Sequence, residues 1–158
     1  MGRWMISGNE RRFMEEALRL AREAAALGEV PVGAVVVQHD EVVAGAHNLR
    51  ESLQDPTAHA EILALRLAST RLGTWRLDGC DLYVTLEPCA MCAGAIVLAR
   101  VERCLFGARD PKGGFLGTVG DLSHHPALNH RFEVVPDLLA EESAEVLSGF
   151  FRALRSRG

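Results

Sequence analysis

The chain has 158 residues, 48% of them hydrophobic and 24% charged, and its net charge is −4. This composition predicts one globular domain over residues 1–158 and excludes a largely disordered chain. The apolar run at 90–99 is about half as long as a membrane span, and the first residues lack the apolar core of a secretory signal. We therefore expect a soluble, cytoplasmic protein without a membrane partner.

The basic residues have an unusual composition, since Lys112 is the only lysine and every other cation is an arginine. Arginine binds phosphate bidentately and stacks on bases, although a GC-rich genome would also favour its codons. The tail FFRALRSRG places Arg152, Arg155 and Arg157 together without an acid. An excess of acid does not itself suggest a nucleic-acid partner, so this local cluster is the more informative feature.

The first half of the chain predicts a helix and then a hairpin. Apolar residues recur at helical spacing over 9–27, Ser7 and Glu10 fit a capping box, and Gly28 fits a C-terminal stop. Two β-branched runs, 32–37 and 42–46, flank a polar turn at 38–41.

Helices and strands alternate in the rest of the chain, and the order predicts an α/β fold with three layers, in which helices flank one mixed β-sheet. Asp55-Pro56-Thr57 predicts the entry to a helix that ends near Ser69. The later elements are expected to be a strand at 81–86, a helix at 88–100, a strand at 101–107, an irregular loop at 108–130, a short strand at 132–135 and a C-terminal helix at about 137–155, capped by Asp137.

Two of the four cysteines have the spacing of a chemical site. Cys89 and Cys92 stand three residues apart at a helix start, where free amides and the helix dipole favour thiolates. Alone, this C-x-x-C is either a redox pair or half of a zinc site. Cys80 and Cys104 are interpreted as small buried hydrophobic residues.

His59 and Glu61 favour the zinc interpretation. One histidine and two thiolates give zinc three protein ligands and leave a fourth position for water, as in catalytic sites. A carboxyl such as Glu61 beside that water can move protons during attack on a ring carbon. Without the cysteines, His59 would be a surface or capping residue, and Glu61 a first-turn acid that stabilises its helix.

The combined pattern H-x-E…P-C-x-x-C is the signature of zinc-dependent nucleoside and nucleobase deaminases. The chain resembles this family, and within it the bacterial tRNA adenosine deaminases, from the first helix to Arg152. The resemblance is carried by VPVGAVVV (30–37), Asn48, DPTAHAEILALR (55–66), LYVTLEPCAMCAGAI (82–96), FGARD (106–110) and HHPALNHR (124–131).

The resemblance implies a cytidine deaminase-like fold, one Zn²⁺ per chain and a homodimer. It implies that His59, Cys89 and Cys92 hold the metal and that Glu61 shuttles protons. The implied reaction is deamination of adenosine to inosine at the wobble position of an arginine tRNA, bound through its anticodon stem-loop.

The resemblance also assigns substrate contacts. Asn48 would contact the purine ring, although it could instead be a turn residue that ends the hairpin. Asp110, otherwise a turn residue before Pro111, would lie near the ribose, whose 2′-hydroxyl distinguishes RNA from DNA, so DNA is not expected as a partner. Asn129 and Arg152 are further RNA candidates. The segment 113–117 is more apolar than in the family, and phosphate contacts would rest on Arg109, Lys112 and residues 152–157.

Other functions fit the same residues less fully. The alternative enzyme is a deaminase of a free nucleobase or nucleoside of the guanine or cytosine type. The alternatives of another class are a nucleic-acid-binding module with a structural zinc, which needs a fourth protein ligand, and a C-x-x-C redox protein.

Overall fold

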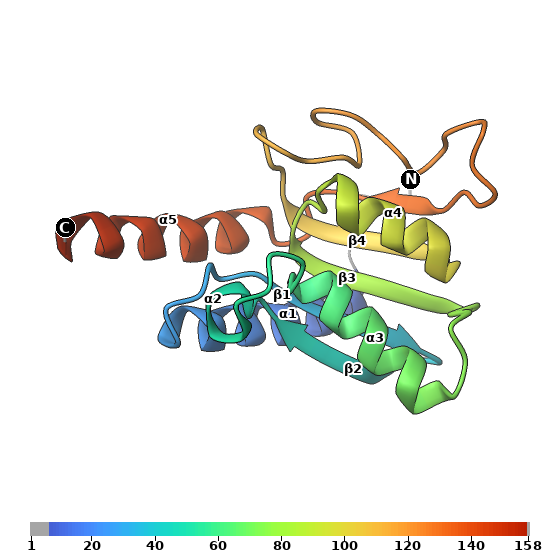
Figure 1. Cartoon of the computed structure of the whole chain (residues 1–158), viewed down its shortest axis with the longest axis horizontal. Helices are drawn as coiled ribbons and strands as arrows, with labels where there is room; N and C mark the ends of the chain where they lie inside the picture. The colour runs from blue at the N-terminus through green and yellow to red at the C-terminus, as the bar shows by residue number, and fades with distance from the viewer. Residues whose placement is uncertain (1–6, 158) are drawn as a thin grey trace.

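A five-stranded β-sheet in the order β2-β1-β3-β4-β5 forms the centre of the protein (Figure 1). The computed structural model describes residues 7–157. β1 pairs antiparallel with β2 and β3, whereas β3-β4 and β4-β5 are parallel, so the sheet is mixed as predicted. The strands are β1 (Gly33–Gln38), β2 (Glu41–His47), β3 (Cys80–Leu86), β4 (Arg103–Ala108) and β5 (Glu133–Val135).

Helices cover both faces of the sheet, which confirms the three-layer α/β prediction (Figure 1). Alternate strand residues face opposite layers. Val35 and Val37 pack with the helix residue Phe13 on one face, whereas Ala34 and Val36 face the other layer. The first layer holds α1 (Gly8–Ala26) and α5 (Ala140–Arg157), and the second holds α3 (Ala60–Leu72) and α4 (Ala90–Ala99).

The start and end of α1 follow the predicted signals. Ser7 and Glu10 form the capping box, and Gly28 adopts a positive φ of 80° just after the helix. α1 also packs very closely on β1, because a Cβ at Gly33 would lie 2.0 Å from the carbonyl oxygen of Ala17. A side chain at position 33 would therefore push the helix away from the sheet.

Three local predictions were wrong, two of them because a carboxylate binds a partner other than its own helix. The helix expected from Asp55 begins at Ala60, since the Asp55 carboxylate binds Thr57 in a tight turn. Asp137 does not cap α5, because it has a positive φ and its carboxylate binds Arg109. The hairpin turn is shorter than expected, with only His39 and Asp40 between β1 and β2 and both at positive φ.

The short helix α2 (Arg50–Leu53) was not predicted; it is a single helical turn that ends at Gln54 in the left-handed conformation. It lies in the segment that connects β2 to α3, which is the segment that leads into the histidine of the candidate site.

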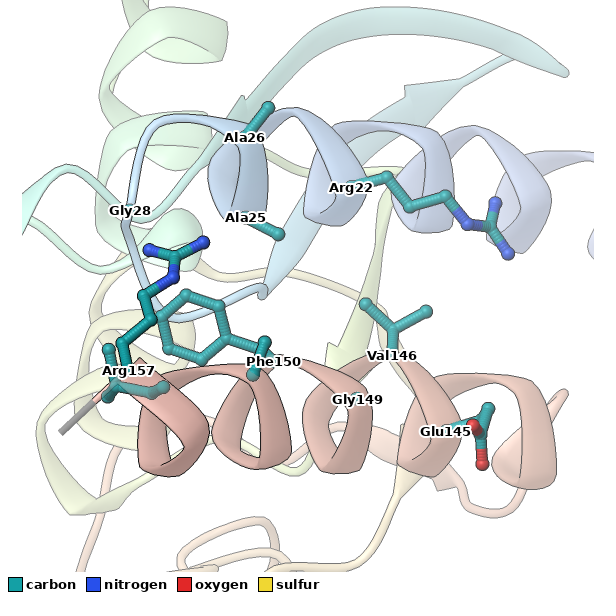
Figure 2. A pocket seen from close by; sticks show the side chains of 11 residues that line it. Arg22, Ala25, Ala26, Gly28, Glu145, Val146, Gly149, Phe150 and Arg157 are labelled. Carbon is teal, nitrogen blue, oxygen red and sulfur yellow. The ribbon is translucent and has the colours of Figure 1, made fainter.

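The outer part of α5 extends beyond the sheet (Figure 1). Ser143 is its only fully buried residue. Figure 2 shows Val146 and Phe150 extending from α5 towards the end of α1, where a groove of about 420 Å³ separates the two helices. No helix within residues 7–157 combines the length and the apolar character that crossing a membrane requires.

Candidate metal and active site

The structure brings His59, Cys89 and Cys92 together, although they come from two different helices. The Nδ1 atom of His59 lies 3.7 Å from the Sγ atom of Cys89 and 3.6 Å from that of Cys92. Tetrahedral zinc with bonds of about 2.3 Å to sulfur and about 2.0–2.1 Å to nitrogen requires N···S distances of about 3.5–3.6 Å. The three donors therefore fit one zinc ion, in both their chemistry and their spacing.

Two helix N-termini meet at this cluster. His59 is the N-cap residue of α3, Cys89 is the N-cap residue of α4, and Cys92 lies in the first turn of α4. The positive ends of both helix dipoles therefore face the two sulfurs and favour their negative form. The cluster lies where the parallel strand β3 ends, an edge of an α/β sheet that commonly carries ligand sites.

The thiols of the pair differ in charge. Hydrogen bonds from Cys92 and from His59 lower the pKa of Cys89 to about 3. The pKa of Cys92 is raised, because its thiol donates to Cys89 and because it is buried. The pKa of His59 is raised, first by its hydrogen bond to Cys89. All four cysteines are free thiols, so the structure holds no disulfide between Cys89 and Cys92.

Glu61 is the buried acid of this site, with 4% of its surface exposed. It lies in the first turn of α3, two residues after His59. Burial raises the pKa of its carboxyl to about 7, which the charge of His59 partly offsets. A carboxyl with a pKa near neutrality can both accept and release a proton, as general acid–base catalysis requires.

Asn48 reaches the site from the end of β2. Its Oδ1 atom accepts a hydrogen bond of 2.8 Å from the backbone nitrogen of Ala60, and so it satisfies the first turn of α3 in place of a local cap. Asn48 is therefore more than a turn residue that ends the hairpin, because its side-chain amide caps a helix that begins twelve residues later. Because Oδ1 already accepts this bond, we expect Asn48 to contact the purine ring through its Nδ2 donor.

The remaining predicted contact residues do not cluster as tightly. Asp110 is half-buried, and its carboxylate accepts from the backbone nitrogen of Lys112. Asn129 is exposed in the 108–130 loop, next to His130, which donates to the carbonyl of Val101. Arg152 is exposed on α5 and pairs with Glu145 at 3.0 Å.

Two features of the expected RNA contacts differ from a simple exposed cationic surface. Arg109, one of the expected phosphate contacts, already forms an ion pair with Asp137. The apolar bulk of segment 113–117 faces inward, since Leu116 is buried in the core and Phe115 packs against it.

Two buried carboxylates, Glu29 and Glu87, were not predicted from the sequence. Glu29 accepts hydrogen bonds from the backbone nitrogens of Glu51 and Ser52 and from the Ser52 hydroxyl, and so it holds α2. Glu87 accepts four bonds from the loop after β4. The signal for Glu87 was a charged residue between Leu86 and Pro88, in an otherwise apolar context.

Known proteins resemble the chain over nearly all of its length. The family model of MafB19-like deaminases matches residues 8–155. The tRNA-specific adenosine deaminase of Bacillus subtilis (strain 168) is 54% identical over 92% of this chain and 90% of its own. That of Aquifex aeolicus (strain VF5) is 50% identical over 91% of this chain and 95% of its own.

Solved structures agree with these relatives. A structure from studies of A-to-I editing by tRNA:A34 deaminases at the wobble position of transfer RNA has a TM-score of 0.84 and 48% identity, and it covers 86% of this chain and 99% of the other. A guanine deaminase from Nitrosomonas europaea has a TM-score of 0.74 and 27% identity, over 92% of this chain and 85% of its own. The chain thus belongs to the family of tRNA-specific adenosine deaminases.

Proposed function

We propose that this protein deaminates adenosine to inosine at the wobble position of the anticodon of an arginine tRNA. The observation that carries the proposal is the meeting of His59, Cys89 and Cys92 beside the buried carboxyl of Glu61, in a chain more than half identical to a tRNA-specific adenosine deaminase. The three donors would hold one zinc ion per chain. Because tRNA decodes messenger RNA in the cytoplasm, we place the enzyme there.

A zinc ion held by His59, Cys89 and Cys92 would supply a water of lowered pKa, about 7, as the nucleophile. Glu61 carries out the proton transfers. Its carboxylate takes one proton from the water and delivers it to N1 of the purine, where it remains in inosine. It then passes the second proton to the exocyclic amine, which leaves C6 as ammonia while the oxygen of water remains on C6. Adenosine and water thus give inosine and ammonia.

Four residues would hold the substrate. Asn48 would donate from Nδ2 to an acceptor on the purine edge, because its Oδ1 is bound to Ala60. Asp110 would accept from the ribose 2′-hydroxyl and so select RNA. Asn129 and Arg152 are exposed, and they would contact the stem-loop away from the metal ligands.

The second candidate function is deamination of a free purine base, which the structural likeness to the guanine deaminase favours. Purified protein would be assayed on an anticodon stem-loop and on free adenosine, cytidine and guanine. Inosine formed only in the stem-loop supports the tRNA function. Turnover of the free compounds alone would contradict it.

Glu61→Ala tests the proton shuttle. The variant should retain one zinc per chain, because Glu61 is not a ligand, and should lose activity by at least about 100-fold. Metal analysis and stem-loop deamination are measured on the same sample. Activity close to that of the parent would exclude the proposed role, and loss of zinc would show that Glu61 supports the metal instead.

We further propose a homodimer that buries the outer face of α3 and α4. Leu98 is 70% exposed there, beside a shallow groove of about 400 Å³ lined by Ile62, Leu65, Trp75 and Ala95. Contiguous exposed apolar surface of this kind commonly marks an interface. Leu98→Glu should convert a dimer to a monomer in sedimentation, whereas Leu27→Glu, which changes a leucine that is also mostly exposed, just after α1, should not.

A further inference from the structure

Glu87 connects two parts of the proposed site. It stands between the end of β3 and Cys89, the N-cap of α4, and only 2% of its surface is exposed. Within residues 7–157, the hydrogen bonds that its carboxylate accepts all come from the loop of residues 110–118, which follows β4. The donors are the backbone nitrogens of Asp110 (3.1 Å), Leu116 (3.0 Å) and Thr118 (3.1 Å) and the hydroxyl of Thr118 (2.5 Å).

The arrangement requires a carboxylate. Each oxygen accepts two of the four hydrogen bonds, and all four donors are N–H or O–H groups. An ionised carboxyl offers only acceptors, whereas a glutamine would turn an NH₂ group towards N–H donors. A buried donor left without a partner is costly. Glutamine at position 87 should therefore release part of the loop while it preserves the size of the side chain.

Gly114 is an independent sign that the loop is fitted to this carboxylate. A Cβ at position 114 would lie 2.3 Å from Oε1 of Glu87, so any side chain there would displace the loop. The neighbouring Gly113 has room, since its Cβ would meet only Asp110 Oδ2 at 3.6 Å. The backbone nitrogen of Phe115 also donates to the carbonyl of Pro88 at 2.8 Å, which adds a second attachment to the same segment.

We propose that Glu87 is a positioning residue that holds the 110–118 loop, and with it Asp110, at a set place relative to the metal-binding end of α4. The proposal rests on the proposed tRNA function, because Asp110 is there the ribose contact. Loss of the Glu87 contacts should weaken RNA binding and leave the metal ligands in place, since Cys89 and Cys92 are held by α4 and not by the loop.

The test compares Glu87→Gln and Gly114→Ala with the control Gly113→Ala. Amide hydrogen exchange at Asp110, Leu116 and Thr118 should rise at least tenfold in the first two variants and remain unchanged in the control. Zinc content should stay at one per chain in all three. Should Glu87→Gln fail to fold, Thr118→Val removes a single hydroxyl donor and should accelerate exchange at position 118 alone. Unchanged exchange in the variants that fold would overturn the proposal.

Binding to a labelled anticodon stem-loop is measured in a Glu61→Ala background, so that no turnover occurs. We expect Kd to rise about tenfold or more in Glu87→Gln and in Gly114→Ala, and the double variant to be little weaker than either, because both changes disrupt one contact. In the active background KM should rise more than kcat falls. A loosened loop with parental Kd would refute the role in RNA binding. If the parent itself does not bind the stem-loop, it is the proposed function that fails.

Discussion

The two polar atoms of the Asn48 side chain have separate tasks, and two substitutions separate them. Oδ1 accepts from the backbone nitrogen of Ala60, a fully buried residue at the start of α3. Nδ2 donates to none of the residues that the structure describes and is the proposed purine contact. Asn48→Asp retains the acceptor and removes the donor, whereas Asn48→Ala removes both.

The structure sets the size of each effect. Loss of a cap typically costs about 1 kcal/mol, and a buried N–H left without a partner costs about 1–3 kcal/mol. These two estimates describe the same bond, so Asn48→Ala should lower the free energy of unfolding by about 2 kcal/mol. For a chain of this length, that corresponds to a Tm lower by about 4–8 °C. Asn48→Asp should change Tm by less than about 2 °C, because an anionic oxygen also suits a helix N-terminus.

Thermal unfolding and stem-loop deamination would be measured on both variants, with zinc content as the check on the metal site. We expect Asn48→Asp to retain Tm and lose kcat/KM at least about tenfold, as removal of one hydrogen bond to substrate would produce. Asn9→Asp on α1 serves as the control for the added charge. Parental activity of Asn48→Asp would refute the purine contact, and an unchanged Tm of Asn48→Ala would refute the capping role.

Three other outcomes are expected. Glu29→Gln should lower the free energy of unfolding by about 2–3 kcal/mol. Burial raises the pKa of Glu29, but hydrogen bonds from Ser52 and Glu51 outweigh it and hold the pKa below the usual value of a glutamate. The difference from the parent in urea unfolding should thus be fully present above the pKa of an unfolded glutamate, about 4.3, and be lost as the pH falls through the lowered pKa of the folded state. Iodoacetamide should modify half-buried Cys89 before the three buried cysteines in metal-free protein, and added zinc should protect it, as peptide mass spectrometry would show; equal labelling of all four would contradict the burial pattern. Arg152→Ala with Arg155→Ala should weaken stem-loop binding and flatten its salt dependence, and an unchanged slope would show that α5 does not contact phosphate.

The sequence predicted the layers of the fold because they depend on a pattern that repeats. β1 and β3 are almost continuously apolar because helices cover both of their faces, and such runs, alternating along the chain with helical patterns, are visible without coordinates. Predicted boundaries were wrong where a side chain bound a partner other than its own helix. Asp55 and Asp137 both suit a helix start, yet one binds Thr57 and the other binds Arg109, far away in the sequence.

The candidate site was predictable in part for the same reason. His59, Glu61, Cys89 and Cys92 belong to short motifs whose spacing carries the chemistry, and the structure brings the three donors together. Their roles in metal binding and proton transfer stay predictions. Glu29 and Glu87 were missed because their hydrogen-bond partners lie more than twenty residues away, so the sequence around each residue does not show what its carboxylate binds.

The way the two helices of the site begin has a consequence for the metal-free protein. His59 and Cys89 occupy the N-cap positions of α3 and α4, but neither side chain bonds to the amides of its own helix. Asn48 makes up for this in α3, whereas no side chain in the described part of the chain does so in α4. The first turn of α4 should therefore fray when zinc is stripped away, so a protease that recognises this turn would distinguish depleted enzyme from loaded enzyme before any global unfolding occurs.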